Sequence, residues 1–209
     1  MNKEKLIESL KGRGFPSIIT DAFSSVQREN FVPNNLRDYA YEDTALPIGE
    51  GQTISQPYTI AFMLNLLELD RIKENKKIKD KKAKILEIGS GSGFVLALLS
   101  TICPNAKIYG VEIKKEFIIK SKSALTDCKN VILLNKSGFS GLPDKAPYNY
   151  ILISASSPNV EIIEKISQQL KNNGILVAPV KNSIFQIKKH QGSLKKKEFH
   201  GFSFVPLLK

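Results

Sequence analysis

Three glycines at alternate positions follow a short apolar run near the middle of the chain. Residues 85 to 93 read Ile-Leu-Glu-Ile-Gly-Ser-Gly-Ser-Gly, and apolar residues 94 to 102 then predict a helix. A strand, a glycine turn and a helix in this order can cradle a nucleotide cofactor, because a Cβ atom in the turn would block the close approach of backbone to ligand. The candidate cofactor-binding residues of this loop are Glu87, Gly89, Ser90, Gly91, Ser92 and Gly93.

A second acid stands further along the chain. Residues 107 to 112 read Lys-Ile-Tyr-Gly-Val-Glu, a predicted strand that ends in Glu112. This acid lies about twenty residues past the glycines, the distance at which the end of the second strand meets the ribose hydroxyls of a nucleotide. Glu112 and the adjacent Ile113 are therefore further candidates for cofactor binding. The alternative is a bare tight turn between strand and helix, with Glu112 a solvated strand end.

From Lys84 onward, segments typical of strands and of helices alternate. We predict strands near residues 84–88, 107–112, 131–134, 149–153 and 174–178. We predict helices near residues 93–101, 114–125 and 159–170. Such alternation indicates an α/β fold with a mostly parallel sheet and helices on both faces. Because ligands of open α/β sheets bind at the carboxyl ends of the strands, the glycine loop, Glu112, residues 135–138 and residues 154–158 are expected around one site.

The flanking segments complete the predicted organisation. Two or three short helices are expected before residue 45, and an amphipathic helix over residues 56–69 has Pro57 in its first turn. An antiparallel hairpin is expected from Ser183–Lys188 and Phe199–Val205, joined through Gln191-Gly192. We therefore predict a single domain, 1–209, with a helical substrate-side region at 1–69, a charged linker at 70–83, a cofactor-binding core at 84–182 and a β hairpin at 183–209.

Composition excludes several kinds of protein. No apolar run approaches the roughly 18 residues that cross a bilayer, and the first ten residues predict an amphipathic helix rather than a signal peptide, so we expect a cytoplasmic protein. Cys103 and Cys128 have no partners at metal spacing, and we expect no metal. The net charge of +11 raises the possibility of nucleic acid, but the lysine runs at 70–84 and 195–197 lack the interleaved aromatic residues that stack on bases.

Specific motifs resemble a known family. The Glu-x-Gly-x-Gly-x-Gly form of residues 87–93 resembles the first motif of S-adenosylmethionine-dependent methyltransferases, which implies a Rossmann-like fold. Upstream, residues 41–57, which include Thr-Ile-Ser-Gln-Pro at 53–57, resemble protein-L-isoaspartate O-methyltransferases. Further matching segments are Phe31-Val32-Pro33, residues 147–151, residues 174–180 and Phe204-Val205-Pro206-Leu207. The resemblance covers nearly the whole chain from about residue 15.

This resemblance implies an activity and a set of site residues. Enzymes of the family transfer the methyl group of S-adenosylmethionine to the free α-carboxylate of L-isoaspartyl residues in damaged proteins, and leave S-adenosylhomocysteine. The ester then cyclises to a succinimide, which reopens partly to aspartate. Ser55 matches the active-site serine and Thr53 its hydroxyl neighbour, and both are expected to be catalytic. The implied substrate-binding residues are Thr53, Ile54, Ser55 and Gln56.

The resemblance also has departures. After the third strand the family usually has Gly-Asp-Gly, whereas this chain has Lys136-Ser137-Gly138, so that Ser137 replaces a carboxylate near the adenine. Ser137 and Gly138 remain expected cofactor-binding residues. Residues 154–157, Ser-Ala-Ser-Ser, are more polar than the run of alanines usual in the family. We expect isoaspartyl-containing proteins and peptides as partners, no specific nucleic acid, no membrane, and a monomer.

The implied reaction suits a chain without a catalytic histidine or cysteine. An α-carboxyl group has a pKa of about 3.5 and is already ionised at neutral pH, so no general base is needed. The protein must align the carboxylate with the methyl group and exclude water. Hydroxyls at Thr53 and Ser55 can hold a carboxylate oxygen without neutralising it. Alternatively, Ser55 caps the helix that follows, since it precedes Gln56-Pro57.

Two other functions remain open. A methyltransferase that acts on RNA or another substrate would be attracted by the positive charge, but residues 153–158 lack the Asn/Asp-Pro-Pro-aromatic motif of base amino methylation, and Cys103-Pro104 reverses the Pro-Cys order of cytosine C5 methylation. A binding module that has kept the fold but lost cofactor affinity is suggested by Ser137.

Overall fold

A computed structural model describes residues 1–70 and 83–209. The linker predicted at 70–83 therefore lies almost wholly outside the described residues. Among the described residues, no helix is long and apolar enough to cross a membrane.

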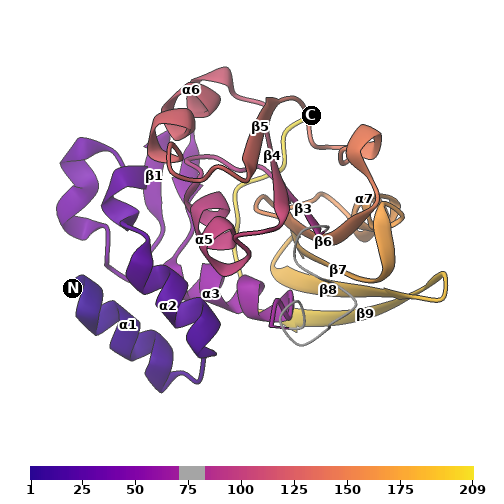
Figure 1. The fold of residues 1–209 in the computed structure, drawn as a ribbon, viewed down its shortest axis with the longest axis horizontal. Coiled ribbons are helices and arrows are strands. Elements are labelled where there is room, and N and C mark those ends of the chain that lie inside the picture. The colour runs from indigo at the N-terminus through magenta and orange to yellow at the C-terminus, as the bar shows by residue number, and fades with distance from the viewer. Residues whose placement is uncertain (71–82) are drawn as a thin grey trace.

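A seven-stranded sheet organises the chain (Figure 1). Its strands are β3 (Lys84–Ile88), β4 (Lys107–Glu112), β5 (Val131–Asn135), β6 (Tyr148–Ile153), β7 (Leu170–Val180), β8 (Ser183–His190) and β9 (Ser193–His200). The spatial order is β5-β4-β3-β6-β7-β8-β9; β3 to β7 pair in parallel, and β8 and β9 add an antiparallel end. The strand order reverses beside β3, so a crevice is expected at its carboxyl end. The predicted α/β fold with its parallel core is confirmed.

Helices cover both faces of the sheet. The helices α5 (Phe94–Ile102) and α6 (Lys115–Ala124) follow β3 and β4, and α7 (Val160–Ser167) follows β6. Side chains that alternate along β3 divide between two cores: Ile85 packs with α5, while Leu86 and Ile88 pack with α7. The central strands are thus buried on both faces, which explains their nearly continuous apolar sequence.

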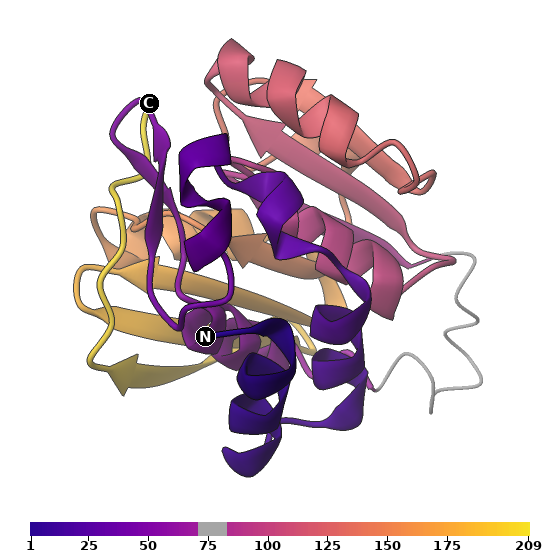
Figure 2. The ribbon, with the colours of Figure 1, turned by 90° about the vertical axis from the view of Figure 1, so that its left-hand side faces the viewer.

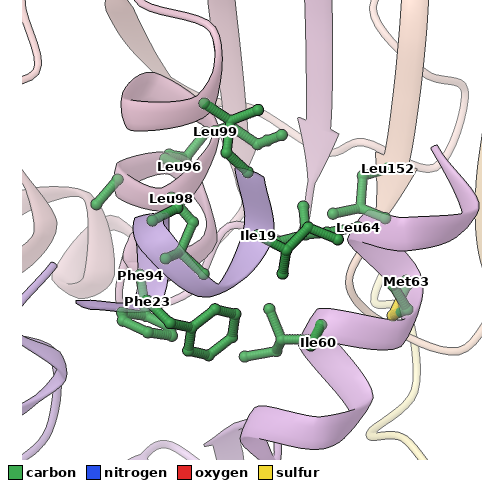
Figure 3. Close-up of a cluster of buried hydrophobic side chains, with 14 of the residues drawn as sticks. Ile19, Phe23, Ile60, Met63, Leu64, Phe94, Leu96, Leu98, Leu99 and Leu152 are labelled. Atoms are coloured by element: carbon green, nitrogen blue, oxygen red, sulfur yellow. The ribbon is translucent and has the colours of Figure 1, made fainter. Parts of the chain in front are cut away.

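The N-terminal region covers the same face of the sheet as α5: its helix α2 (Ser17–Ser25) packs against α5, and its helix α3 (Pro57–Leu66) packs against β7. It also contains α1 (Lys3–Gly12) and the short 3-10 helices η1 (Arg28–Phe31) and η2 (Asn34–Tyr39). Figure 3 shows side chains of α2 and α3 gathered against α5, and the rings of Phe23 and Phe94 meet edge to face at 5.7 Å. The prediction that α3 is amphipathic is wrong: most of its residues are buried, because it is covered by its neighbours on nearly every side.

The sequence did not predict a two-stranded antiparallel sheet within this region. It consists of β1 (Leu46–Gly49) and β2 (Gln52–Ile54), joined by a tight turn in which Gly49, Glu50 and Gly51 all have positive φ. This β1–β2 hairpin carries Thr53 toward the carboxyl end of β3, so the substrate-side region is helical only in part.

Several element boundaries differ from the prediction, among them the end of α3 at Leu66 rather than residue 69 and the span Leu170–Val180 of β7 rather than 174–178. The second strand of the C-terminal hairpin is Ser193–His200, not Phe199–Val205; Gly201 turns the chain out of the sheet with φ +94°, and the lysine run lies on this exposed edge strand. The helix predicted over 159–170 ends at Ser167, because β7 begins at Leu170 with an irregular stretch around Asn173, whose φ is +62°.

Candidate active site

The glycine loop joins the end of β3 to the start of α5. The amides of Gly89 and Ser90 both donate to the carbonyl of Val111 on β4, at 2.8 and 3.2 Å, which anchors the loop to the neighbouring strand. Gly93 precedes α5 with φ +89°, and a Cβ there would lie 2.9 Å from Leu125 Cδ1. The third glycine of the motif is therefore required both by backbone conformation and by the packing of the helix.

Glu112 stands at the end of β4, where the sequence places it beside a nucleotide. Its side chain is 7% exposed, and its two carboxylate oxygens accept hydrogen bonds from the amides of Gly91 and Lys114, each at 2.9 Å. These bonds fix the orientation of the carboxylate. Each oxygen keeps a further lone pair, so the group can still accept hydrogen bonds from a ligand's hydroxyls.

Glu87, at the end of β3, is an unusual buried acid. It is 1% exposed; one carboxyl oxygen accepts a hydrogen bond from Ser154 Oγ at 2.7 Å, and the other has no partner among the described residues. Burial raises its pKa to about 8; the hydrogen bond from Ser154 acts against this shift, and the charge of Glu112 adds to it. The buried hydroxyl of Ser90 also lacks a partner within the described chain. Two unpaired polar atoms beside a cavity indicate a ligand with polar groups.

Three adjoining cavities surround these residues. The first, with about 470 Å³ of empty space, is lined by the glycine loop and Glu87 together with the apolar Ile60, Met63, Phe94 and Leu152. The second, about 530 Å³, is lined by Glu112, Ile113 and Gly138. The third, about 1410 Å³, is a wide groove that includes Gln56 and Phe202. Most of the cofactor candidates thus line the first two cavities, and the groove adjoins them through shared lining residues.

Thr53 lines all three cavities, and Ser55 lines the first cavity and the groove. The two hydroxyls predicted to be catalytic therefore stand where the cavities meet. Ser55 does not cap α3: the cap residue is Gln56, and the amide of Tyr58 in the first turn is bound instead by Asp43 Oδ1 at 2.8 Å. The capping alternative for Ser55 is not what the structure shows.

The C-terminal residues close the second cavity. Val205, Pro206, Leu207 and Leu208 line it together with Ile48 and Gln52 of the β1–β2 hairpin. Two backbone hydrogen bonds hold this segment to Ser156, one from the Ser156 amide to the Val205 carbonyl and one from the Leu207 amide to the Ser156 carbonyl, both at 2.8 Å. Figure 2 shows the yellow C-terminal segment beside the purple hairpin.

The predicted site residues are mostly brought together. Ile54 and Ser92 line the first cavity. Two predicted residues, Gly93 and Ser137, line none of the three cavities; Ser137 is exposed, and its hydroxyl accepts a hydrogen bond from the amide of Phe139 at 3.3 Å. Gly138 does line the second cavity, and a Cβ there would lie 2.2 Å from Ile88 Cγ2. The contact of Ser137 with a cofactor stays a prediction.

Sequence reasoning gave no site role to the C-terminal segment, to the hydrogen bond of Ser154 with Glu87, or to the apolar wall of the first cavity. The Phe-Val-Pro-Leu sequence at 204–207 was the available signal for the segment. Nothing in the sequence pairs Ser154 with an acid 67 residues earlier.

The fold and the site define a class: a Rossmann-like α/β enzyme with a glycine loop, a buried acid at the end of the second strand and an adjoining groove, as in the S-adenosylmethionine-dependent methyltransferases. The sequence model of the family "Protein-L-isoaspartate(D-aspartate) O-methyltransferase (PCMT)" matches residues 1–209. The chain belongs to this family, and the resemblance found in the sequence is confirmed.

Individual relatives agree with this assignment. A Flavobacterium psychrophilum protein-L-isoaspartate O-methyltransferase is 39% identical over 99% of this chain and 93% of its own, and one from Christiangramia forsetii is 35% identical over the same shares. A solved protein-L-isoaspartate O-methyltransferase superposes with a TM-score of 0.82 at 26% identity, covering 98% of this chain and 65% of that one. A Plasmodium falciparum protein described by the same name, in complex with S-adenosyl-L-homocysteine, has a TM-score of 0.79 at 23% identity over 100% and 99% of the two chains, a likeness that shows the fold.

Proposed function

We propose that this chain transfers the methyl group of S-adenosylmethionine to the free α-carboxylate of L-isoaspartyl residues in damaged proteins and peptides. The observation that carries the proposal is the position of Thr53, which lines the two cofactor-side cavities and the groove at once. The hydroxyls of Thr53 and Ser55, the apolar lining of the first cavity, and linings in which no histidine or cysteine stands among the described residues all match a reaction between a carboxylate and a cation. Family membership supplies the substrate class.

The residues around the first two cavities fit the cofactor. Glu112 is oriented for ribose hydroxyls in the second cavity, next to Ile113 and Gly138. In the first cavity, the unpaired oxygen of Glu87 suits an ammonium group, and the unpaired hydroxyl of Ser90 suits a polar partner. When bound, S-adenosylmethionine supplies an activated methyl group on a sulfonium. The fit of these groups argues against a binding module that has lost its cofactor.

The chain's own part in the reaction is alignment and exclusion of water. A carboxylate in the groove is already a nucleophile at neutral pH. The hydroxyls of Thr53 and Ser55 are neutral donors that can hold one oxygen of the substrate carboxylate. A lysine in their place would neutralise the carboxylate and weaken it as a nucleophile. Ile60, Met63 and Phe94 give the first cavity an apolar lining, and an apolar site that excludes water removes the hydration shell that weakens a carboxylate. Alignment of the reacting atoms can lower the activation free energy of the displacement by several kcal/mol, on the order of known proximity effects.

The partners and location follow from the same proposal. Isoaspartyl-containing proteins and peptides are the substrates, the chain works as a monomer in the cytoplasm, and neither nucleic acid nor membrane takes part. The alternative substrate, RNA, was suggested only by the net charge, and membership of this family does not support it.

The decisive experiment is methyl transfer from labelled S-adenosylmethionine to an isoaspartyl peptide, with the matched aspartyl peptide as control. We expect label on the isoaspartyl peptide alone, as a base-labile ester. Label on neither peptide, while the cofactor still binds, would overturn the repair function and leave the methyltransferase class standing. RNA would then be the next substrate to test.

A further inference from the structure

Arg28 is a buried cation outside the three cavities. It begins the 3-10 helix η1 and is 1% exposed. Burial lowers its pKa to about 9, although Asp43 and Tyr41 act in the opposite direction, so the guanidinium stays charged at neutral pH. A charge removed from water in this way is costly unless it is well bonded. Its placement therefore calls for a reason that packing alone does not provide.

The hydrogen bonds of Arg28 go to two backbone carbonyls. Nε donates to the carbonyl of Ala40 at 2.8 Å, and Nη2 donates to the carbonyl of Ser55 at 3.0 Å. These two residues stand immediately before and immediately after residues 41–54, which contain the β1–β2 hairpin and Thr53. The guanidinium thus joins the two ends of the segment that carries the predicted catalytic hydroxyls.

A third contact ties this junction to the cofactor loop. The Arg28 guanidinium carbon lies 5.0 Å from the centre of the Phe94 ring, within the range of a cation–π interaction. Phe94 is the first residue of α5, directly after Gly93, and it lines the first cavity. Arg28 therefore touches both the hydroxyl-bearing segment and the element that starts at the glycine loop.

From these contacts we infer that Arg28 is a positioning residue for methyl transfer: it sets the place of Ser55 and Thr53 relative to the cofactor loop, without touching either substrate. The inference rests on the proposed function. A planar guanidinium can bridge two carbonyls and stack on a ring at the same time, which an ammonium cannot do. A displacement needs its reacting atoms aligned closely, and a shift of about 1 Å can lower the rate about a hundredfold.

The test compares the wild type with Arg28→Lys, which keeps the charge but not the bridge. At saturating cofactor and isoaspartyl peptide, we expect the single-turnover rate to fall about a hundredfold. The dissociation constant of S-adenosylhomocysteine, measured by calorimetry, should change little, because the residues of the first two cavities are intact. If the lysine variant does not fold, Arg28→Gln replaces it, since a neutral amide leaves no buried charge to satisfy.

A matched control separates positioning from lost stability. Ile163→Val and Ile163→Ala remove buried atoms of α7 on the opposite face of the sheet and lower the melting temperature by graded amounts. The inference is supported if the Ile163 variants react at the wild-type rate while an Arg28 variant of similar melting temperature reacts slowly. A rate in Arg28→Lys no lower than in a control of the same melting temperature would overturn it.

A second readout does not depend on the reaction. Amide hydrogen exchange within residues 41–55 should speed up in Arg28→Lys, while exchange in α7 stays as in the wild type. If the wild type fails to methylate the isoaspartyl peptide, the proposed function fails. The exchange result still decides whether Arg28 holds this segment, and unchanged exchange there would refute that role.

Discussion

The buried carboxyl of Glu87 predicts an unusual dependence of stability on pH. Its pKa of about 8 in the folded protein compares with 4.5 for an ordinary glutamate, the value expected in the unfolded chain. The folded state thus holds a proton that the unfolded state releases. The resulting contribution to stability is fully present below about pH 4.5 and is lost as the pH rises to about 8. At about 1.4 kcal/mol for each pKa unit, the whole effect is on the order of 5 kcal/mol.

Glu87→Gln isolates this contribution, because the amide has nearly the same shape and does not titrate. Urea unfolding of the cofactor-free protein from pH 5.5 to 9 should show the wild type losing stability relative to the variant, by a few kcal/mol. Glu164→Gln on α7 is the matched control, since it removes one acid from a partly exposed site. A wild-type-minus-variant difference that is flat over this range would refute a raised pKa for Glu87.

The same carboxyl should release a proton when the cofactor binds. The unpaired oxygen of Glu87 is the expected partner of the cofactor's ammonium, and that pairing favours the ionised form. Calorimetry with S-adenosylhomocysteine at pH 7, in two buffers of different ionisation enthalpy, should show the release of about one proton. Glu87→Gln should release none and should bind about tenfold to a hundredfold more weakly. Release of a proton by the variant as well would assign it to another group.

Three further variants test the remaining site residues. Glu112→Ala should weaken S-adenosylhomocysteine about tenfold to a hundredfold, because it removes charge-assisted hydrogen bonds; unchanged affinity in a folded variant would contradict the ribose role. Ser55→Ala should lower turnover on the isoaspartyl peptide with little change in cofactor affinity, and intact turnover would remove Ser55 from the reaction. Gly93→Ala should lower the unfolding free energy by about 1–3 kcal/mol, because a Cβ would lie 2.9 Å from Leu125 Cδ1 at φ +89°; wild-type stability in urea would show that the loop can relax.

The parts of the fold that the sequence predicted are those governed by local chemistry. The glycine loop, Glu112 and the strands from Lys84 to Ile153 depend on short-range patterns: apolar runs, backbone requirements and one acid at a fixed distance. These elements formed within a residue or two of the predicted bounds. The hydroxyls of Thr53 and Ser55 were found through the family resemblance, and the structure places them at the junction of the cavities.

The parts that could not be predicted depend on contacts between distant residues. The strands of the β1–β2 hairpin have four and three residues, too short for an alternating pattern to show. From the sequence alone, Arg28 would be expected on the surface. Its burial depends on hydrogen bonds to the carbonyls of Ala40 and Ser55, which lie far from it in the sequence. Ser137 was named through the family's Gly-Asp-Gly segment; its hydroxyl accepts a hydrogen bond from the amide of Phe139, and its contact with a cofactor stays a prediction.

The second cavity is closed by Ile48 and Gln52 on one side and by residues 205–208 on the other, two parts of the chain that are more than 150 positions apart by their numbering. Neither part belongs to the sheet that anchors the glycine loop. On the proposed function, full cofactor affinity requires that both the β1–β2 hairpin and residues 205–208 stay docked, so local unfolding of either one should weaken cofactor binding before the sheet unfolds. By mass action, cofactor at about 100 times its dissociation constant would hold both segments in place with about 2.7 kcal/mol. Bound cofactor would therefore oppose local unfolding of both segments, and resistance to heat and to proteases should rise with cofactor concentration.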